Sequence, residues 1–176
     1  MGIEIEKKFL TKEIPFDLSS FPCHEIEQGY LNVHPAVRIR KEDDDYYMTY
    51  KAVKENYDGI GKTEYNMELD RQSYEHLRTK VDGNIITKKR YIIPINQDGF
   101  DSDYLDNNPS LKKAIENGSV KIELDVFEGV FKGRILAEIE FPSEDAAAHY
   151  KMADWFFEDV TGDTGYSNSQ MSREKV

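Results

Sequence analysis

Charged residues recur at every second position in several segments of the chain. The acidic ones are Glu4, Glu6, Glu64, Glu68, Glu123, Asp125, Glu138 and Glu140, and the basic ones are Lys8, Arg38, Arg40, Lys51, Lys88 and Arg90. Alternate residues of a β-strand share one face, about 6.6 Å apart at a rise of roughly 3.3 Å per residue. Carboxylates at that spacing can converge on a hard divalent cation such as Mg²⁺ or Mn²⁺, whereas arginine and lysine bind phosphate oxygens. The residue types therefore predict a site for a metal-bound polyanion and metal-assisted phosphoryl transfer.

A polar face open to water is the alternative explanation of these charges, because antiparallel sheets often expose one side. Two features argue against it. Charges recur on nearly every expected strand, where uncharged polar residues would serve equally well, and acidic and basic pairs fall on different strands. A barrel closed around such faces would be too charged to stay dry and would need a charged ligand.

The elements that must position these residues are mainly strands. Alternation of apolar and polar residues predicts strands at residues 3–9, 25–33, 37–40, 46–51, 64–69, 88–93, 121–126, 130–136 and 137–141. Capping residues Asp70 and Ser143 predict helices over residues 70–81 and 143–157, with shorter helices at 110–117 and 168–175. Residues 96–108 are rich in Asp, Asn and Gly and predict an exposed loop. We expect a single domain over residues 1–176, of the α+β class and dominated by β-structure.

Composition limits the classes of partner. The chain has 176 residues and a net charge of −11, which disfavours general binding to nucleic acid or to anionic membranes. No apolar run reaches the roughly 18 residues of a membrane span, and the first residues lack the pattern of a signal peptide. Cys23 is the only cysteine, so an internal disulfide is excluded and we expect a cytoplasmic protein.

Other chemistries find little support in the residues. The four histidines show no paired ligand spacing, which argues against a zinc site. Gly59-Ile60-Gly61-Lys62 is too short for a phosphate-binding glycine-rich loop and predicts a hairpin turn instead.

An ordered set of short motifs carries a family resemblance along nearly the whole chain. Glu4-Ile5-Glu6-Lys7-Lys8 matches the pattern ExExK. It is followed by Gln28-Gly29-Tyr30-Leu31, Val37-Arg38-Ile39-Arg40, Thr49-Tyr50-Lys51, Thr63-Glu64-Tyr65-Asn66, Lys88-Lys89-Arg90-Tyr91, Glu123-Leu124-Asp125-Val126-Phe127, Leu136-Ala137-Glu138-Ile139-Glu140, Val160-Thr161-Gly162-Asp163 and Tyr166-Ser167-Asn168. The set resembles the CYTH superfamily, the triphosphate tunnel metalloenzymes, and is most similar to the small bacterial inorganic triphosphatases.

The resemblance implies an eight-stranded antiparallel β-barrel that forms a tunnel, with a few flanking helices. It implies Mg²⁺ or Mn²⁺ as cofactor, held by Glu4, Glu6, Glu138, Glu140 and Glu123. It implies triphosphate binding by Lys8, Arg38, Arg40, Lys51, Lys88 and Arg90, and catalytic roles for Lys8, Glu64 and Asp125. The acidic positions Glu64, Glu123 and Asp125 would bind a second metal or orient the attacking water. Asn66 stands where many relatives carry a second glutamate, which bears on that second metal.

The implied reaction is hydrolysis of a phosphoanhydride bond of inorganic triphosphate, a small-molecule substrate, by a monomer or homodimer. Nucleoside or thiamine triphosphatase activity, adenylyl cyclase activity and binding of polyphosphate or a nucleotide without turnover remain as alternatives. A β-rich interaction domain with solvated charges is a further one. Residues 96–119 exceed the length of a simple hairpin and would either cover a tunnel mouth or form a surface insertion.

Overall fold

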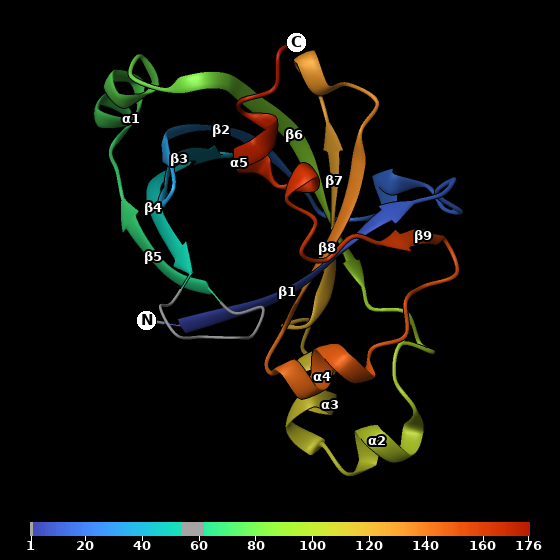
Figure 1. Cartoon of the computed structure of the whole chain (residues 1–176). Helices are drawn as coiled ribbons and strands as arrows, with labels where there is room; N and C mark the ends of the chain where they lie inside the picture. Colours follow the sequence, from blue (N-terminus) through green and yellow to red (C-terminus); the bar gives the residue numbers. More distant parts are fainter. Residues whose placement is uncertain (1, 54–61) are drawn as a thin grey trace.

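The computed structural model describes residues 2–53 and 62–176 of the chain. In these residues nine antiparallel strands form one sheet, in the order β5-β4-β3-β2-β6-β7-β8-β1-β9 (Figure 1). The strands are β1 (Gly2–Thr11), β2 (Cys23–Val33), β3 (Ala36–Glu42), β4 (Asp45–Val53), β5 (Lys62–Glu68), β6 (Asp82–Pro94), β7 (Lys121–Phe127), β8 (Ile135–Phe141) and β9 (Phe156–Asp159). The expected hairpin turn at residues 59–62 lies, up to residue 61, outside the described residues.

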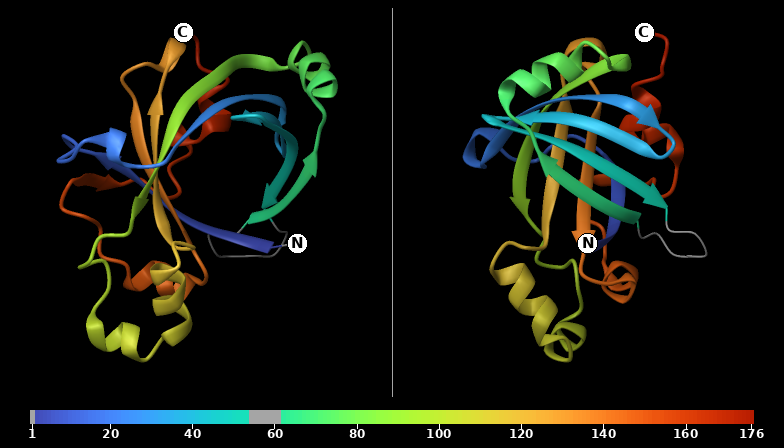
Figure 2. Two further views of the ribbon diagram at one scale, coloured as in Figure 1. Left: turned by 180° about the vertical axis from the view of Figure 1, so that it is seen from behind. Right: turned by 90° about the vertical axis from the view of Figure 1, so that its left-hand side faces the viewer.

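The sheet curls so strongly that β5, the strand at one end of the order, also pairs with β1 near the other end. Strand β1 pairs with β8 from Ile5 to Leu10, and its first residues pair with β5, from Gly2↔Glu64 to Glu4↔Lys62. Strands β1 to β8 therefore run around a common interior, seen from two further sides in Figure 2. The predicted eight-stranded antiparallel architecture is confirmed, and β9 adds a ninth strand beside the far end of β1.

The helices are short and flank the sheet. They are α1 (Arg71–Arg78), α2 (Ser102–Asp106), α3 (Pro109–Glu116), α4 (Glu144–His149) and α5 (Asn168–Met171), with single 3₁₀ turns η1 (Leu18–Ser20), η2 (Gly129–Phe131) and η3 (Thr164–Tyr166). Asp70 caps α1 by accepting a hydrogen bond from the backbone N–H of Ser73 at 2.6 Å, as predicted. The helix ends earlier than expected because β6 already begins at Asp82.

Three sequence expectations are wrong in detail. The helix expected over residues 143–157 ends at His149, and Phe156 instead enters β9, where its ring stacks on Phe9 at 4.7 Å between centroids. The strand expected over residues 130–136 is replaced by η2, and β8 begins only at Ile135. The loop expected over residues 96–108 contains α2 and buries Phe100 against the core.

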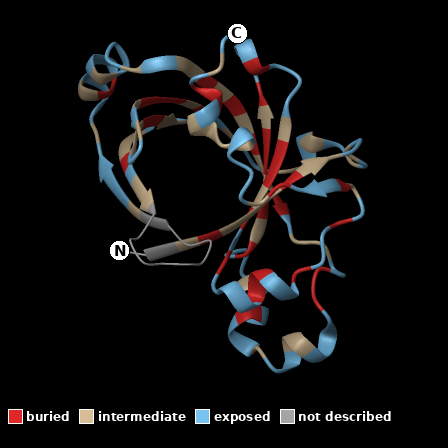
Figure 3. Cartoon of the chain, viewed as in Figure 1, coloured by how far each residue is buried: buried red, intermediate tan, exposed pale blue. Residues whose placement is uncertain are grey.

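The apolar core lies outside the curled sheet. Along β8, Ala137, Ile139 and Phe141 are buried against α4 and its neighbours, whereas the alternate residues Glu138 and Glu140 face the interior. This is the two-faced pattern expected of a strand with a period of two residues. Burial is concentrated on β6 to β8 and the adjoining helices, while β5 is largely exposed (Figure 3). No described helix has the length and apolar character needed to cross a bilayer.

Candidate active site

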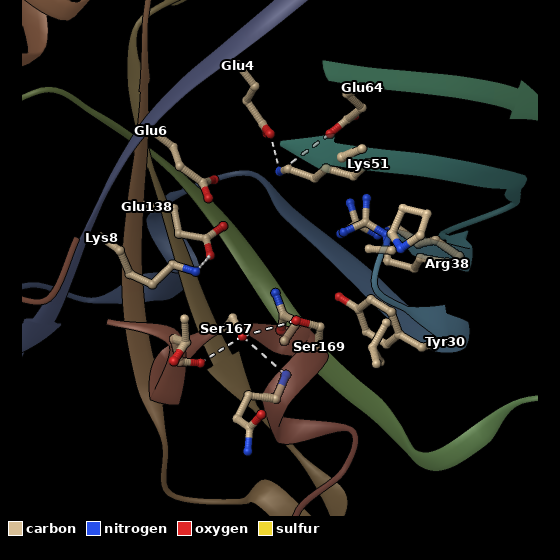
Figure 4. Close-up of a pocket in the computed structure, with 18 of the residues that line it drawn as sticks. Glu4, Glu6, Lys8, Tyr30, Arg38, Lys51, Glu64, Glu138, Ser167 and Ser169 are labelled. Atoms are coloured by element: carbon tan, nitrogen blue, oxygen red, sulfur yellow. Dashed lines mark hydrogen bonds and ion pairs between the residues drawn. The ribbon is translucent and has the colours of Figure 1, made fainter. Parts of the chain in front are cut away.

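A cavity of about 750 Å³ occupies the interior of the curled sheet. Most of the residues predicted from the sequence line it, and Figure 4 shows several of them converging from β1, β3, β4, β5 and β8. The predicted site residues on its surface are Glu4, Glu6, Lys8, Arg38, Arg40, Lys51, Glu64, Arg90, Glu123, Glu138 and Glu140. The fold therefore brings together, in one space, side chains that are up to 136 positions apart in the chain, from Glu4 to Glu140.

Lys51 of β4 lies between the carboxylates of Glu4 and Glu64, near the N-terminal end of β1. Its ammonium group forms an ion pair with Glu4 and lies 3.5 Å from Glu64 Oε2 on the neighbouring strand β5. Burial, helped by the nearby charges of Glu6 and Glu64, raises the pKa of Glu4 to about 7 in spite of Lys51. This end of the cavity thus carries more carboxylates than its own cations neutralise.

Lys8 occupies the middle of the same wall. Its Nζ lies 2.8 Å from Glu138 Oε1 and donates a hydrogen bond to the backbone oxygen of Tyr166 at 3.4 Å. Burial alone would lower the pKa of Lys8, but the charges of Glu138 and Glu6 outweigh it and raise the pKa above its ordinary value. Lys8 is therefore a cation at neutral pH.

Arg90 sits at the centre of a buried network of carboxylates. It donates to Asp125 Oδ1 at 2.7 Å and Oδ2 at 2.8 Å, to Glu138 Oε2 at 2.9 Å, and also to Glu123. Lys88 forms an ion pair with Asp125 behind it, and both of these side chains are almost fully buried. The structure places Lys88 and Asp125 beneath Arg90 and not on the cavity surface, in contrast to the contacts expected for them.

Burial also governs the titration of this network. It lowers the pKa of Lys88 to about 8, with the adjacent Arg90 cation contributing and Asp125 opposing. The pKa of Glu138 is held well below its ordinary value, because the charges of Lys8, Arg90 and Lys88 outweigh the cost of burying its carboxylate. Glu138 is accordingly ionised and faces the cavity between two cations.

A chain of hydrogen bonds across three strands links Arg38 to Glu64. Arg38 Nη2 donates to Thr49 Oγ1 at 3.3 Å, Thr49 donates to Asn66 Oδ1 at 2.6 Å, and Asn66 Nδ2 donates to Glu64 Oε1 at 2.9 Å. Lys51 and this amide hydrogen bond lower the pKa of Glu64 although the side chain is half-buried. Asn66, the residue that departs from the family pattern, therefore orients Glu64.

The carboxylates fit a hard divalent cation by their chemistry. Glu4, Glu6, Glu138 and Glu140 share one wall, and burial together with Glu123 and Glu64 raises the pKa of Glu140. Such unrelieved repulsion between oxygen donors is what a bound Mg²⁺ or Mn²⁺ would remove. Within the described residues no three acidic, histidine or cysteine side chains are already gathered at ligand spacing, so these side chains would have to adjust around an ion.

The C-terminal segment supplies part of the cavity wall that the sequence did not predict. Thr164, Ser167, Asn168, Ser169, Gln170 and Arg173 line it. The segment is fastened to β6, because the N–H of Asn84 donates to Ser172 O at 2.6 Å and its side chain donates to Glu174 O at 2.8 Å. The motif Tyr166-Ser167-Asn168 was the only signal of this role in the sequence.

No protein-family model matches the chain. Two proteins named inorganic triphosphatase are similar to it along almost their whole lengths. The one from Nitrosomonas europaea is 31% identical over 173 residues, covering 96% of each chain, and the one from Acetivibrio thermocellus is 31% identical over 175 residues, covering 97% of this chain and 94% of its own. A crystal structure of an inorganic triphosphatase matches 99% of this chain and 97% of its own with a TM-score of 0.65 and 29% identity.

Sequence similarity, strand order and the charged cavity all lead to the same family. The similarity extends over the whole fold, so it includes every strand that lines the cavity. The protein belongs to the CYTH superfamily of triphosphate tunnel enzymes, in the group of the inorganic triphosphatases.

Proposed function

We propose that this protein hydrolyses inorganic triphosphate to diphosphate and orthophosphate inside the cavity, with Mg²⁺ or Mn²⁺ as cofactor. The observation that carries the proposal is the separation of charge within one cavity. Carboxylates of β1 and β8 form one wall, and Arg38 and Arg40 of β3 belong to the opposite side of the ring. A polyphosphate needs both, because cations bind its oxygens while carboxylates hold the metal that offsets its remaining charge.

The metal would be held by Glu4, Glu6, Glu138 and Glu140. When bound, it supplies neutralisation of the charge that develops on the phosphoryl oxygens. Glu123, like Glu138, accepts a hydrogen bond from Arg90, so both carboxylates also help to position that arginine. Lys88 and Asp125 act in the same way, since they contact Arg90 or its partner from behind and do not reach the cavity.

The triphosphate would be bound by cations of the opposite side. Arg38 and Arg40 present guanidinium groups that can bind phosphate oxygens through two parallel hydrogen bonds. Lys8 and Lys51 add point charges next to the carboxylate wall, where the metal-bound end of the substrate would lie. Each of these groups is in place before the substrate arrives, which reduces the reorganisation that the reaction requires.

Glu64 is the proposed acceptor for the proton of the attacking water. It faces the cavity as an ionised carboxylate, oriented by Asn66 and 3.5 Å from Lys51. The water oxygen would bond to the terminal phosphorus, the bond from that phosphorus to the bridging oxygen would break, and diphosphate would leave. The water proton would pass to Glu64.

A product assay on metal-stripped protein tests the proposal. Tripolyphosphate, ATP and thiamine triphosphate are each supplied with and without Mg²⁺ or Mn²⁺, and orthophosphate, diphosphate and cyclic AMP are measured. Metal-dependent release of orthophosphate, fastest from tripolyphosphate, is expected. Glu6→Gln should reduce this rate at least about a hundredfold, while the exposed control Glu116→Gln on α3 keeps it. Cyclic AMP formation, or full turnover in Glu6→Gln, would overturn the proposal.

A further inference from the structure

Two buried arginines border the cavity, and their partners differ in charge. Arg90 donates to three carboxylates, Glu123, Asp125 and Glu138, which offset its charge together with those of Lys88 and Lys8. Arg40 lies on β3, and its main partner is the neutral side chain of Gln28 on β2. The side chains that hold Arg90 are therefore negatively charged, whereas the side chain that holds Arg40 is neutral.

Gln28 holds Arg40 by a two-pronged contact. Gln28 Oε1 accepts from Arg40 Nε at 3.0 Å and from Nη2 at 2.8 Å, and the two residues face each other in the register of β2 and β3. Gln28 is completely buried and Arg40 is 7% exposed. Because Oε1 is engaged by two donors, the orientation of the amide is defined and Nε2 points away from the guanidinium group.

Tyr47 completes the support of Arg40 from the other side. Arg40 Nη1 donates to the Tyr47 hydroxyl at 3.2 Å, and this hydroxyl donates to Glu42 Oε2 at 2.5 Å. Glu42 itself is 3.8 Å from Arg40 Nη1, so the phenol stands between the two charges. A guanidinium group has five N–H bonds, and the contacts found in the described residues use three of them. Two remain for a ligand in the cavity.

The charges near Arg40 reflect the same arrangement. Burial and the cations Arg38 and Arg90 lower the pKa of Arg40, whereas Asp125 and Glu123 raise the pKa of Arg90 against the effect of burial. Arg40 is thus a buried cation whose surroundings favour the arrival of an anion.

We infer that Gln28 is a positioning residue that aims Arg40 at the cavity while leaving its positive charge available to the triphosphate. A carboxylate in the same place would give equally good hydrogen bonds but would neutralise the guanidinium group, and an apolar side chain would leave it without a fixed orientation. The amide is the side chain of this length that accepts both hydrogen bonds without a charge. This inference rests on the proposed function.

The substitution Gln28→Glu separates the two properties. It keeps an oxygen at Oε1 and replaces Nε2, which has no hydrogen-bond partner in the described residues, so no contact seen there is broken. The variant should fold, because its carboxylate pairs with a buried arginine and no hydrogen bond of the described residues is lost. We expect that it nevertheless binds triphosphate poorly.

Calorimetric binding of tripolyphosphate to the metal-free protein is the direct measurement, with thermal unfolding recorded alongside. Gln28→Glu should raise the dissociation constant roughly tenfold or more, and raise KM far more than it lowers kcat. Gln28→Met should also raise KM and, in addition, lower the unfolding temperature. The matched control Gln97→Glu adds the same charge on an exposed turn and should bind like the wild type. Wild-type affinity in a folded Gln28→Glu protein would overturn the inference.

The outcomes for wild type and variant distinguish this inference from the proposed function. A wild type that binds tripolyphosphate but does not hydrolyse it refutes the proposed reaction, and the change in dissociation constant still decides the role of Gln28. A wild type that hydrolyses tripolyphosphate, with Gln28→Glu unchanged in affinity and KM, refutes the role of Gln28 alone. A purely structural role would leave the affinity of Gln28→Glu for tripolyphosphate intact, whatever its unfolding temperature.

Discussion

Lys8 Nζ lies 2.8 Å from Glu138 Oε1, and the two residues face each other in the register of β1 and β8. Only 12% of each side chain is exposed. The pair raises the pKa of Lys8 and holds the pKa of Glu138 well below its ordinary value, against the effect of burial on both groups. Lys8 can therefore bind a phosphate oxygen as a cation, but it is not available at neutral pH to take a proton from water.

Lys8→Met should lower both stability and activity. Removing one member of a buried ion pair costs about 3–5 kcal/mol, and Arg90 still compensates Glu138 here, so we expect a loss of about 2 kcal/mol in the free energy of unfolding. Urea denaturation measures this loss, and phosphate release should fall at least about a hundredfold. The exposed control Lys113→Met should leave both quantities unchanged. Normal turnover in Lys8→Met would contradict a role for this cation.

The stability of the metal-free protein should fall as pH rises toward neutrality. Burial raises the pKa of Glu4 from 4.5 to about 7, so between these values the folded protein binds more protons than the unfolded chain does. Stability is therefore greatest with Glu4 protonated and decreases by roughly 3 kcal/mol as pH rises through this window. The carboxylates of Glu64 and Glu138 have lowered pKa values, so they change the stability only at pH values below about 4.5.

Glu4→Gln provides the test of this dependence. The variant has no carboxylate to ionise, so its free energy of unfolding should vary less with pH over the same range. Chemical denaturation at several pH values compares the two proteins. Equal slopes would show that Glu4 does not carry the effect. In the wild type, Mn²⁺ binding near neutral pH should release a proton that Glu4→Gln does not release.

Asp125→Asn should be the most destabilising change in the network. The carboxylate of Asp125 is fully buried and accepts from both Lys88 and Arg90. Its removal leaves two buried cations with less compensation, and we expect a loss of about 3 kcal/mol in the free energy of unfolding. Thermal and urea unfolding measure it. If Asp125 contacted substrate directly instead, affinity for tripolyphosphate would change while stability stayed near that of the wild type.

Asn66→Asp should shift the pH dependence of hydrolysis. The Asn66 amide donates to Glu64 and keeps its pKa low, whereas an aspartate would repel it. The acidic limb of the pH–rate profile should move upward by roughly one pH unit. Asn117→Asp, at the end of α3, is the matched control and should leave the profile in place. An unmoved limb in Asn66→Asp would exclude Glu64 as the titrating base.

Alternation of residues along the strands explains which parts of the fold and site could be predicted from the sequence. It assigns Glu138 and Glu140 to the interior and Ala137 and Ile139 to the core, because a period of two residues fixes the face of each side chain. The period does not determine how deeply each side chain of that face is buried or whether it reaches the cavity. Lys88 shares its face with Arg90 but lies beneath it, and only tertiary packing decides which of the two reaches the cavity.

The remaining errors lie in segments where the local sequence has no signal for the end of a helix or for a strand. Residues 143–157 contain no glycine or internal proline to stop a helix, and α4 ends because the N–H of Lys151 donates to Gly99 O at 2.8 Å, a contact distant in sequence. Strand β9 has four residues, too few to show alternation. Gln28 is a neutral residue among charged ones, so its role emerges only once Arg40 is seen opposite it.

Gly83 determines how closely the C-terminal segment approaches β6. Its φ is +74°, and a Cβ there would lie 2.1 Å from the backbone oxygen of Ser172. Gly118 has nearly the same φ of +75°, with nothing within 4 Å of the corresponding position. Alanine at either site meets the cost of a left-handed backbone, about 1–2 kcal/mol, but only alanine at position 83 also pushes the segment away.

The comparison of Gly83→Ala with Gly118→Ala therefore isolates the contribution of this wall. Both variants should lose similar stability from the backbone, and Gly83→Ala should lose more. Limited proteolysis should cut the segment around Ser172 faster in Gly83→Ala, and KM for tripolyphosphate should rise in that variant alone, because Ser167 and Asn168 line the cavity. If KM were the same in both variants, the C-terminal segment would bound the cavity without contributing to substrate binding.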